Sequence, residues 1–515
     1  MAFAIVLAAS ADRVRAASVE FRVTLDSRVA DRPLDGQLYV FLSAAPQPEP
    51  RFGPNWFQPE PFFRLDVDGF APDSTRTVDR TAAGFPTTLD DLRPDTYYVQ
   101  ALFDHNLDDQ QHGRAPGNLY TAVQRITIDG SPKQIFSLAL SAKVVEQPFA
   151  GTGTVREIVR RSKLLSNFHG RSVYDVATVV LPDSYFDDPE RRYPTIYSIP
   201  GFGGTHRDAL RSPGLRNDAA GGVEFIRIML SGSCGWGHHV YADSATNGPR
   251  GRALVEELIP YIDQNFRTID ATAARYVTGH SSGGWASLWA QVTHPDTFGG
   301  VWSTAPDPVD FRDFQRIDLY AAPTENMYRD AQGNRRPIAR RNGRPVLWYD
   351  QFTRMDDTIG RGGQLRSFEA VFSPLDDRGQ PRRLWNRRTG TIDPSVADAW
   401  QEYDIRLQLE RQWPTIGSKL QGKLHIFVGS EDTFYLEGAV EKLAATLKSL
   451  ESDAEVVVIA GKDHNTLVSS ELRRRILREM SLAFHRYQSI AQQNLESPAE
   501  RTTEMKANVT PSVGK

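Results

Sequence analysis

Short apolar runs alternate with amphipathic helical patterns along the chain from about residue 176 to residue 484. The runs at 424–428 and 456–460 have the length and apolar character of buried strands. Between them, a spacing of three and four predicts a helix with one buried face, along the series Leu436, Val440, Leu443 and Leu447. Strands joined by such helices form a parallel sheet that is covered on both sides. The predicted fold class is therefore α/β, with a mostly parallel sheet and helices on both faces. Further strands are predicted at 176–181, 193–199, 225–230 and 300–304, and further helices at 254–266 and 472–484.

The first part of the chain has a different pattern. From residue 18 to about residue 142, polar and apolar residues alternate in short runs, which are separated by segments rich in proline, aspartate and glycine. A period of two is typical of strands with one buried face. We predict an all-β sandwich accessory domain at 18–148, with strands at 19–23, 37–42, 97–102 and 135–140.

The α/β pattern occupies residues 155–490, with an insertion from about 308 to 420. The insertion is dense in charged residues, proline and glycine, but it also contains Trp348, Trp385, Trp400 and Trp413. Since tryptophan side chains gain most from burial, this segment is expected to fold rather than to serve as a linker. We expect it to lie over the rim of a site, with a purely structural cap as the alternative. Residues 491–515 are polar and lack periodicity, which predicts a disordered tail.

The ends, the charge and the sulfur content restrict the class of protein. Residues 1–17 open with an apolar run followed by small residues, as a secretory signal or leader remnant does, although a basic start is missing. We expect a secreted or periplasmic protein, and otherwise a cytoplasmic one. No later segment approaches the roughly 18 apolar residues of a membrane span, and a net charge of -4 offers no basic footprint for nucleic acid. With one cysteine, Cys234, the chain forms no internal disulfide.

The stretch at 275–285 reads Arg-Tyr-Val-Thr-Gly-His-Ser-Ser-Gly-Gly-Trp and contains the pattern Gly-x-Ser-x-Gly between a predicted strand and a predicted helix. A serine hydroxyl is a weak nucleophile, so it has to be presented to a base from a tight turn. Glycines at positions 279 and 283 let the backbone make that turn. We predict that Ser281 is the catalytic nucleophile.

A base and an acid follow in the order Ser, Asp or Glu, His. Asp432 and the neighbouring Glu431 come directly after the strand at 424–428, and His464 follows the strand at 456–460. We predict Asp432 as the acid that orients the base, Glu431 as the alternative acid, and His464 as the general base. The adjacent pair at positions 238 and 239 lacks the ligand spacing of a metal site, so no metal and no cofactor are expected.

Backbone N–H groups are needed to stabilise the oxyanion of the tetrahedral intermediate. The residue after the nucleophile, Ser282, supplies one. The glycine-rich loop that follows the strand at 193–199 supplies the second, from Phe202 or alternatively from Gly203.

These motifs resemble those of the α/β-hydrolase esterase family that includes esterase D, enterochelin esterase, the antigen 85 mycolyltransferases, and the feruloyl and acetylxylan esterases. The resemblance covers about 155–310 and 420–485. It is carried by the segments at 174–182, 192–201, 247–249, 257–262, 279–284, 294–298 and 463–464. The long insertion and the β domain depart from the family pattern.

The resemblance and the predicted triad imply a serine esterase that hydrolyses carboxylic esters through an acyl-enzyme, on a small-molecule or carbohydrate-linked substrate. The alternatives are a peptidase or acyltransferase with the same triad, and a non-catalytic carbohydrate-binding or surface-interaction protein. An interfacial lipase lid would present a continuous apolar face, whereas charged residues interrupt this insertion. These arginines either are solvated or bind anionic substrates: Arg335, Arg336, Arg340, Arg341, Arg382, Arg383, Arg387 and Arg388.

Overall fold

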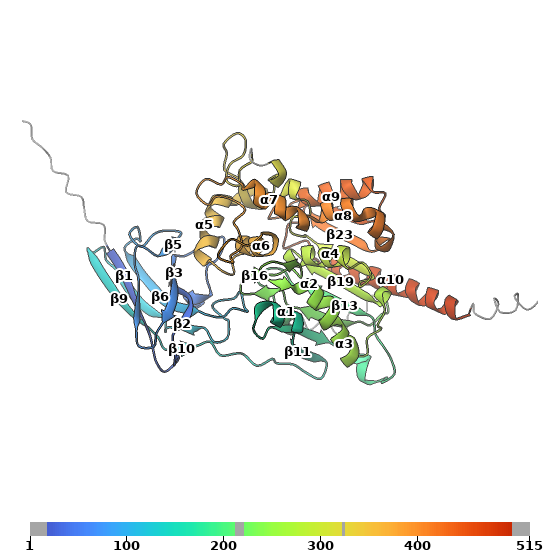
Figure 1. Cartoon of the computed structure of the whole chain (residues 1–515), viewed down its shortest axis with the longest axis horizontal. Coiled ribbons are helices and arrows are strands. Elements are labelled where there is room, and N and C mark those ends of the chain that lie inside the picture. Colours follow the sequence, from blue (N-terminus) through green and yellow to red (C-terminus); the bar gives the residue numbers. More distant parts are fainter. Residues whose placement is uncertain (1–17, 212–220, 322–324, 497–515) are drawn as a thin grey trace, which may run out of the picture. The chain divides into compact units, whose positions relative to one another are not determined.

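The computed structural model describes residues 18–211, 221–321 and 325–496 (Figure 1). The predicted leader at 1–17 and most of the predicted tail at 491–515 lie outside the described residues. The described residues fall into two compact units, one within 1–147 together with Arg354–Gly360, and one comprising the rest.

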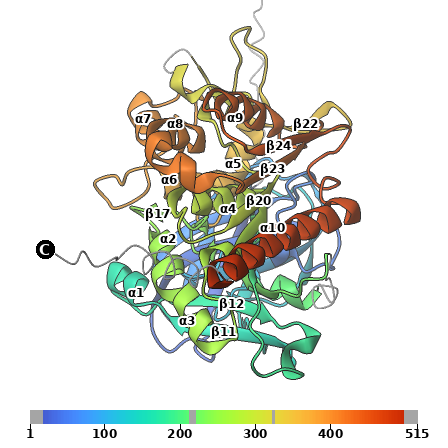
Figure 2. The same cartoon turned by 90° about the vertical axis from the view of Figure 1, so that its right-hand side faces the viewer.

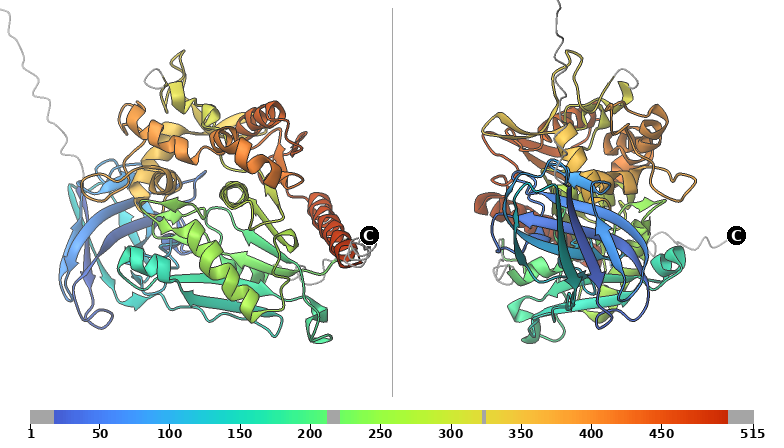
Figure 3. Two further views of the ribbon diagram at one scale, coloured as in Figure 1. Left: turned by 45° about the vertical axis from the view of Figure 1, so that its right-hand side comes forward. Right: turned by 90° about the vertical axis from the view of Figure 1, so that its left-hand side faces the viewer.

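The N-terminal unit contains two β-sheets (Figure 3, right). A three-stranded sheet has the order β4-β1-β9, in which β1 runs parallel to β9. A seven-stranded sheet has the order β10-β7-β6-β2-β3-β5, with β8 paired to β6. The strands are β1 (Ser18–Leu25), β2 (Leu34–Ser43), β3 (Phe62–Phe70), β4 (Thr75–Val78), β5 (Ala83–Phe85), β6 (Asp95–Asp104), β7 (Leu119–Tyr120), β8 (Gln124–Ile128), β9 (Lys133–Leu140) and β10 (Ala142–Lys143).

The two sheets share one hydrophobic core. Every second residue of β1 is buried, and Phe21 and Val23 of that strand pack in one cluster with Leu38 and Val40 of β2 and with Val99 of β6. This is the alternation that the sequence shows. The predicted N-terminal β-rich fold is confirmed.

The second unit is built on an eight-stranded sheet of order β11-β12-β14-β13-β19-β20-β23-β24. The strands β13, β14, β19, β20, β23 and β24 pair in parallel, while β12 runs antiparallel to both of its neighbours. The strands are β11 (Val155–Arg161), β12 (Tyr174–Val180), β13 (Thr195–Ile199), β14 (Ile226–Leu230), β19 (Arg275–His280), β20 (Gly300–Thr304), β23 (Leu424–Gly429) and β24 (Glu455–Ile459). The α/β fold class is confirmed, and β11, which was not predicted, is an edge strand with four charged residues.

Helices cover both faces of this sheet (Figures 2 and 3). The apolar side of α10 (Ser470–Glu496) packs on Tyr276, Trp302 and Phe427 of three neighbouring strands. This cluster contains no residue of α4 (Ser282–Thr293), which contacts β19, β20 and β13 from the other face. The other helices before the insertion are α1 (Lys163–His169), α2 (Arg250–Ala253) and α3 (Ile259–Asn265), and α9 (Glu437–Ser449) follows it.

The insertion between β20 and β23 is folded, as the tryptophans predict. It contains the hairpin of β21 (Pro337–Arg341) and β22 (Arg344–Trp348), and the helices α5 (Tyr349–Ile359), α6 (Gln364–Phe372), α7 (Pro394–Trp400) and α8 (Ile405–Ile416). Within the second unit, α8 contacts α4 and α9, and α6 contacts the short strands β16 (Gly237–His238) and β17 (Asp243–Ser244). Trp400 is buried among Phe311, Phe314 and Phe372.

The last helix, α10, continues to Glu496, beyond the start of the predicted tail. Within the described parts of the chain, no helix is long and apolar enough to cross a bilayer.

Candidate active site

Ser281 stands at the turn between β19 and α4, where its backbone takes the strained angles φ 61° and ψ -126°. A positive φ is rare for a residue with a side chain and is held only by its surroundings. Here the Ser281 N–H donates to the carbonyl of Thr304 at 3.0 Å. The Ser281 carbonyl accepts from the N–H of Trp285 at 3.0 Å and from that of Asp307 at 3.2 Å. The turn therefore projects one serine side chain from the carboxyl end of the sheet.

The glycines of the turn are required by close backbone contacts. A Cβ atom at Gly279 would lie 2.0 Å from the carbonyl oxygen of Gly283, and one at Gly283 would lie 2.0 Å from that of Ile199. A Cβ atom at Gly201 would lie 3.3 Å from the Cβ of Ser281. The loop after β13 thus passes directly beside the predicted nucleophile.

His464 lies against Asp432. Its Nδ1 atom is 2.8 Å from Oδ2 of Asp432, and Oδ1 of the same carboxylate accepts from the N–H of Phe434 at 2.8 Å. Both side chains are buried. Because the carboxylate only accepts, the hydrogen of His464 resides on Nδ1, and Nε2 is left to take a proton.

The surroundings of His464 place it beside the turn and favour its protonated form. Its ring centroid lies 4.6 Å from that of His280, the residue before Ser281. Burial by itself would lower the pKa of His464, but the hydrogen bond and the negative charge of Asp432, together with the charge of Asp307, outweigh it and raise the pKa above its usual value. Burial and the neighbouring His464 instead lower the pKa of His280 to about 4, so His280 is neutral and packs.

The other carboxylates of these loops lie elsewhere. The Glu431 side chain is 51% exposed and approaches Arg340 at 4.0 Å rather than the imidazole. Asp463 accepts hydrogen bonds from the backbone N–H groups of Asn465 and Thr466, and so holds the loop that carries His464.

The two residues expected to stabilise an oxyanion flank the turn. Ser282 is the first residue of α4, where a backbone N–H has no acceptor within the helix. Phe202 and Gly203 lie in the loop after β13, and Gly203 adopts φ 84°. His238 holds this loop, since its Nε2 donates to the carbonyl of Pro200 at 2.9 Å while its Nδ1 accepts a backbone N–H. Both ring nitrogens of His238 are therefore engaged within the protein.

A second buried carboxylate lies at this site, Asp307, which was not predicted from the sequence. The Ser282 hydroxyl donates to Asp307 Oδ2 at 2.5 Å. Burial raises the pKa of Asp307 to about 6, although hydrogen bonds from Ser282 and Ser281 and the charge of His464 act to lower it. Asp307 could have been found from its position just after β20, because the carboxyl ends of parallel strands meet at one edge of a sheet.

Arg340 of the insertion contacts the loop after β23 that carries Asp432. Its guanidinium donates to the carbonyl oxygens of Asp432 at 2.9 Å and Ser430 at 3.2 Å, and pairs with Glu437 at 2.7 Å. Four more arginines of the insertion are also ion-paired: Arg335 with Asp350, Arg336 with Glu325, Arg382 with Asp393, and Arg387 with Glu369. These arginines therefore stabilise the insertion itself.

Among the described residues, one group of side chains has the spacing to hold a metal ion: His425, Glu455 and Glu479, whose ligand atoms lie within 4.8 Å of one another. Arg475 donates to both carboxylates and His425 stacks on Trp302 at 4.4 Å, so these side chains already have partners.

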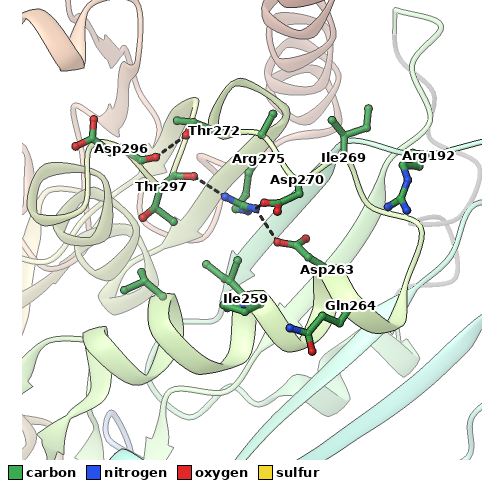
Figure 4. Close-up of a pocket in the computed structure, with 13 residues that line it drawn as sticks. Arg192, Ile259, Asp263, Gln264, Ile269, Asp270, Thr272, Arg275, Asp296 and Thr297 are labelled. Carbon is green, nitrogen blue, oxygen red and sulfur yellow. Dashed lines mark hydrogen bonds and ion pairs between the residues drawn. The ribbon is translucent and has the colours of Figure 1, made fainter.

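A pocket of about 810 Å³ opens at the opposite end of β19 (Figure 4). Arg275, the first residue of that strand, donates there to Asp263 at 2.7 Å, to Asp270 at 3.1 Å and to the carbonyl of Thr297 at 3.1 Å. Its charge is paired within the protein, and the pocket lies away from Ser281.

The chain is 34% identical over 116 residues to Esterase Rv1288 and to Esterase MT1326, from two strains of Mycobacterium tuberculosis. The match covers 21% of this chain and 24% of each relative, so the chain spans about a quarter of their length.

Similar solved structures include a ferulic acid esterase, at 14% identity with a TM-score of 0.42, covering 64% of this chain and 98% of that one. An S-formylglutathione hydrolase from Agrobacterium tumefaciens is similar at 15% identity with a TM-score of 0.41, over 66% of this chain and 98% of that one.

The family model described as Putative esterase matches residues 176–469, which include the turn, the loop after β13, the insertion and both loops that carry Asp432 and His464. More than half of the chain lies in this match. The chain therefore belongs to the Putative esterase family.

Proposed function

We propose that this protein is a carboxylic ester hydrolase with Ser281 as the nucleophile, His464 as the general base and Asp432 as the acid that orients the base. The observation that carries the proposal is the 2.8 Å hydrogen bond between buried His464 Nδ1 and Asp432, beside the strained turn of Ser281. An acid, a base and a nucleophile on three loops at one edge of the sheet are the parts that acyl transfer requires.

In this mechanism the Ser281 hydroxyl attacks the ester carbonyl and loses its proton to Nε2 of His464. Asp432 stabilises the imidazolium that forms. The backbone N–H groups of Ser282 and Phe202 donate to the oxyanion, and the alcohol leaves with the proton from His464. Water then attacks the acyl-enzyme by the same route in reverse. No step calls for a metal or a cofactor.

We propose small or carbohydrate-linked esters as substrates. Arginines of the insertion form ion pairs with carboxylates. Among the described residues of the insertion, the exposed large apolar side chains are Val346 and Leu375, which are too few for a continuous apolar face. An enzyme that acts at a lipid surface needs such a face. The names of the structural neighbours, a ferulic acid esterase and an S-formylglutathione hydrolase, agree with small ester substrates.

Fluorophosphonate labelling followed by ester hydrolysis tests the proposal. Ser281→Ala is expected to lose labelling and to lower kcat on the order of 10⁶-fold, since members of a triad act as a unit. Wild-type turnover should be highest on acetyl, feruloyl or acetylated-sugar esters, lower on palmitoyl esters, and unchanged by EDTA. Hydrolysis by Ser281→Ala near the wild-type rate would refute the assigned nucleophile, and an optimum at long chains would refute the substrate class.

The same panel separates the alternatives. Faster cleavage of peptides than of esters would identify a peptidase. Transfer of the acyl group to an added alcohol in preference to water would identify an acyltransferase. If the wild-type protein neither reacts with the fluorophosphonate nor hydrolyses any substrate of the panel, the non-catalytic binding protein is the remaining alternative.

A further inference from the structure

Two buried polar side chains, Asp307 and Ser282, and the part-buried Gln364 form a chain of hydrogen bonds that leads from the predicted catalytic turn into the insertion. Ser282 Oγ donates to Asp307 Oδ2 at 2.5 Å, and Nε2 of Gln364 donates to Ser282 Oγ at 3.4 Å. Gln364 is the first residue of α6 and lies 82 residues from Ser282 along the chain. The fold of the insertion therefore delivers this amide to the residue next to the nucleophile.

The direction of the hydrogen bonds fixes the orientation of the amide. A serine hydroxyl has one hydrogen, and here it is used on the Asp307 carboxylate. The Ser282 oxygen can then only accept, so the NH₂ group of Gln364 must face it. As a result, the Gln364 Oε1 atom is turned away from Ser282.

That Oε1 atom is buried, and it has no hydrogen-bond partner among the described residues. An amide oxygen removed from water without a partner costs about 1–3 kcal/mol, so such groups are usually satisfied by a water or a ligand.

The start of α6 also lies beside the loop after β13. Gly237 lies between the two: a Cβ atom at this position would be 2.5 Å from Ser367 of α6 and 3.3 Å from the carbonyl oxygen of Gly363. The same Cβ atom would be 3.3 Å from the ring of Phe202. Gln364 therefore contacts Ser282, and the helix end to which Gln364 belongs lies near Phe202. These are the two residues whose N–H groups are proposed to bind the oxyanion.

We propose that Gln364 is a specificity-determining residue whose Oε1 accepts a hydrogen bond from a hydroxyl or N–H group of the substrate near the scissile ester, with Ser282 and Asp307 holding the amide in that orientation. This inference rests on the proposed esterase function and narrows its substrate class to esters that carry a hydrogen-bond donor. The donor belongs either to the acyl part or to the alcohol part, and two arms of one experiment distinguish them.

The experiment compares kcat/KM for esters that differ only by a hydroxyl in place of a methyl group. The acyl arm uses p-nitrophenyl β-hydroxybutyrate and p-nitrophenyl isovalerate, and the alcohol arm uses hydroxyethyl acetate and propyl acetate. In one arm the wild-type enzyme is expected to prefer the hydroxyl-bearing ester, and Gln364→Met is expected to reduce that preference about tenfold or more. Met keeps the length of the side chain but provides no amide oxygen.

Gln412→Met is the matched control, because Gln412 is exposed on α8 and its side chain donates a hydrogen bond to Gln408 in the same helix. It should leave both the preference and the activity unchanged. Rates are normalised to the fraction of sites that fluorophosphonate labels, so that misfolded protein does not count.

Equal preference of the wild-type enzyme for both esters in both arms, or an equal loss on both esters in Gln364→Met, would overturn the inference about Gln364. Failure of the esterase proposal gives a different result, because then neither member of a pair is hydrolysed in a Ser281-dependent way.

Discussion

Asp432→Asn, with Glu431→Gln as its matched control, tests the acid of the site most directly, because the two carboxylates are adjacent in sequence and differ in surroundings. Asp432 is fully buried and 2.8 Å from His464 Nδ1, whereas Glu431 is 51% exposed. An asparagine can present its NH₂ group to Nδ1, which favours the imidazole tautomer that cannot accept a proton at Nε2. Loss of the correct tautomer costs about 10⁴-fold in kcat in serine hydrolases of this kind, or about 5.5 kcal/mol of transition-state stabilisation.

For Glu431→Gln we expect kcat within about threefold of wild type, because an exposed ion pair contributes roughly 0–1 kcal/mol. The assay is kcat and KM on p-nitrophenyl acetate, with thermal melting to check that each variant is folded. A decrease of less than tenfold in Asp432→Asn, or a larger loss in Glu431→Gln, would refute the assignment of the acid.

Three further predictions concern the residues around this pair. Because the pKa of His464 is raised, this base becomes neutral only at a pH above the usual histidine pKa. Asp307→Asn removes a negative charge, so it should lower the pKa of His464 and move the acid limb of the kcat/KM profile to lower pH by up to about one pH unit. An acid limb that stays in place or moves to higher pH would contradict this. Arg340→Met should destabilise the protein by about 3 kcal/mol and lower kcat, because it leaves the part-buried Glu437 carboxylate without its cation. An unchanged midpoint of urea unfolding would contradict a stabilising role of the Arg340–Glu437 pair. Gly283→Ala should destabilise by about 1–3 kcal/mol, because its Cβ would lie 2.0 Å from a carbonyl oxygen of β13, and wild-type melting of this variant would show that the turn relaxes.

The local patterns were sufficient to predict the fold class and most strands. β20 begins and ends at the predicted residues 300–304, and β23 and β24 lie within one residue of prediction. β20 and β23 are largely buried, and β24, although it is only partly buried, is a run of valine and isoleucine, so the signal of these strands lies in neighbouring residues and does not depend on distant partners. The predicted helix at 254–266 consists of a π-helical segment at Leu254–Leu258 and α3, and α2 precedes it directly. The apolar spacing does not reveal this local change in winding.

The turn around Ser281 could also be predicted from the sequence. A strained strand-to-helix turn needs glycines at fixed distances from the serine, and Gly279 and Gly283 lie close to Ser281 in the chain. The sequence favoured Asp432 as the acid but left Glu431 as an alternative. Both follow β23, and the hydrogen bonds of the loop decide which side chain is buried against His464 and which faces solvent.

The sequence by itself determined the α/β architecture and the candidate nucleophile and base, because strand and helix periodicity and turn geometry are properties of neighbouring residues. Only the tertiary structure brought Asp307, Gln364 and Arg340 to the site. Gln364 and Arg340 belong to an insertion without a recognisable motif, and each gains its contacts from residues more than 80 positions away. Contacts of that range depend on how the helices and the hairpin of the insertion pack, and packing is decided by the shapes of many side chains together rather than by any local pattern.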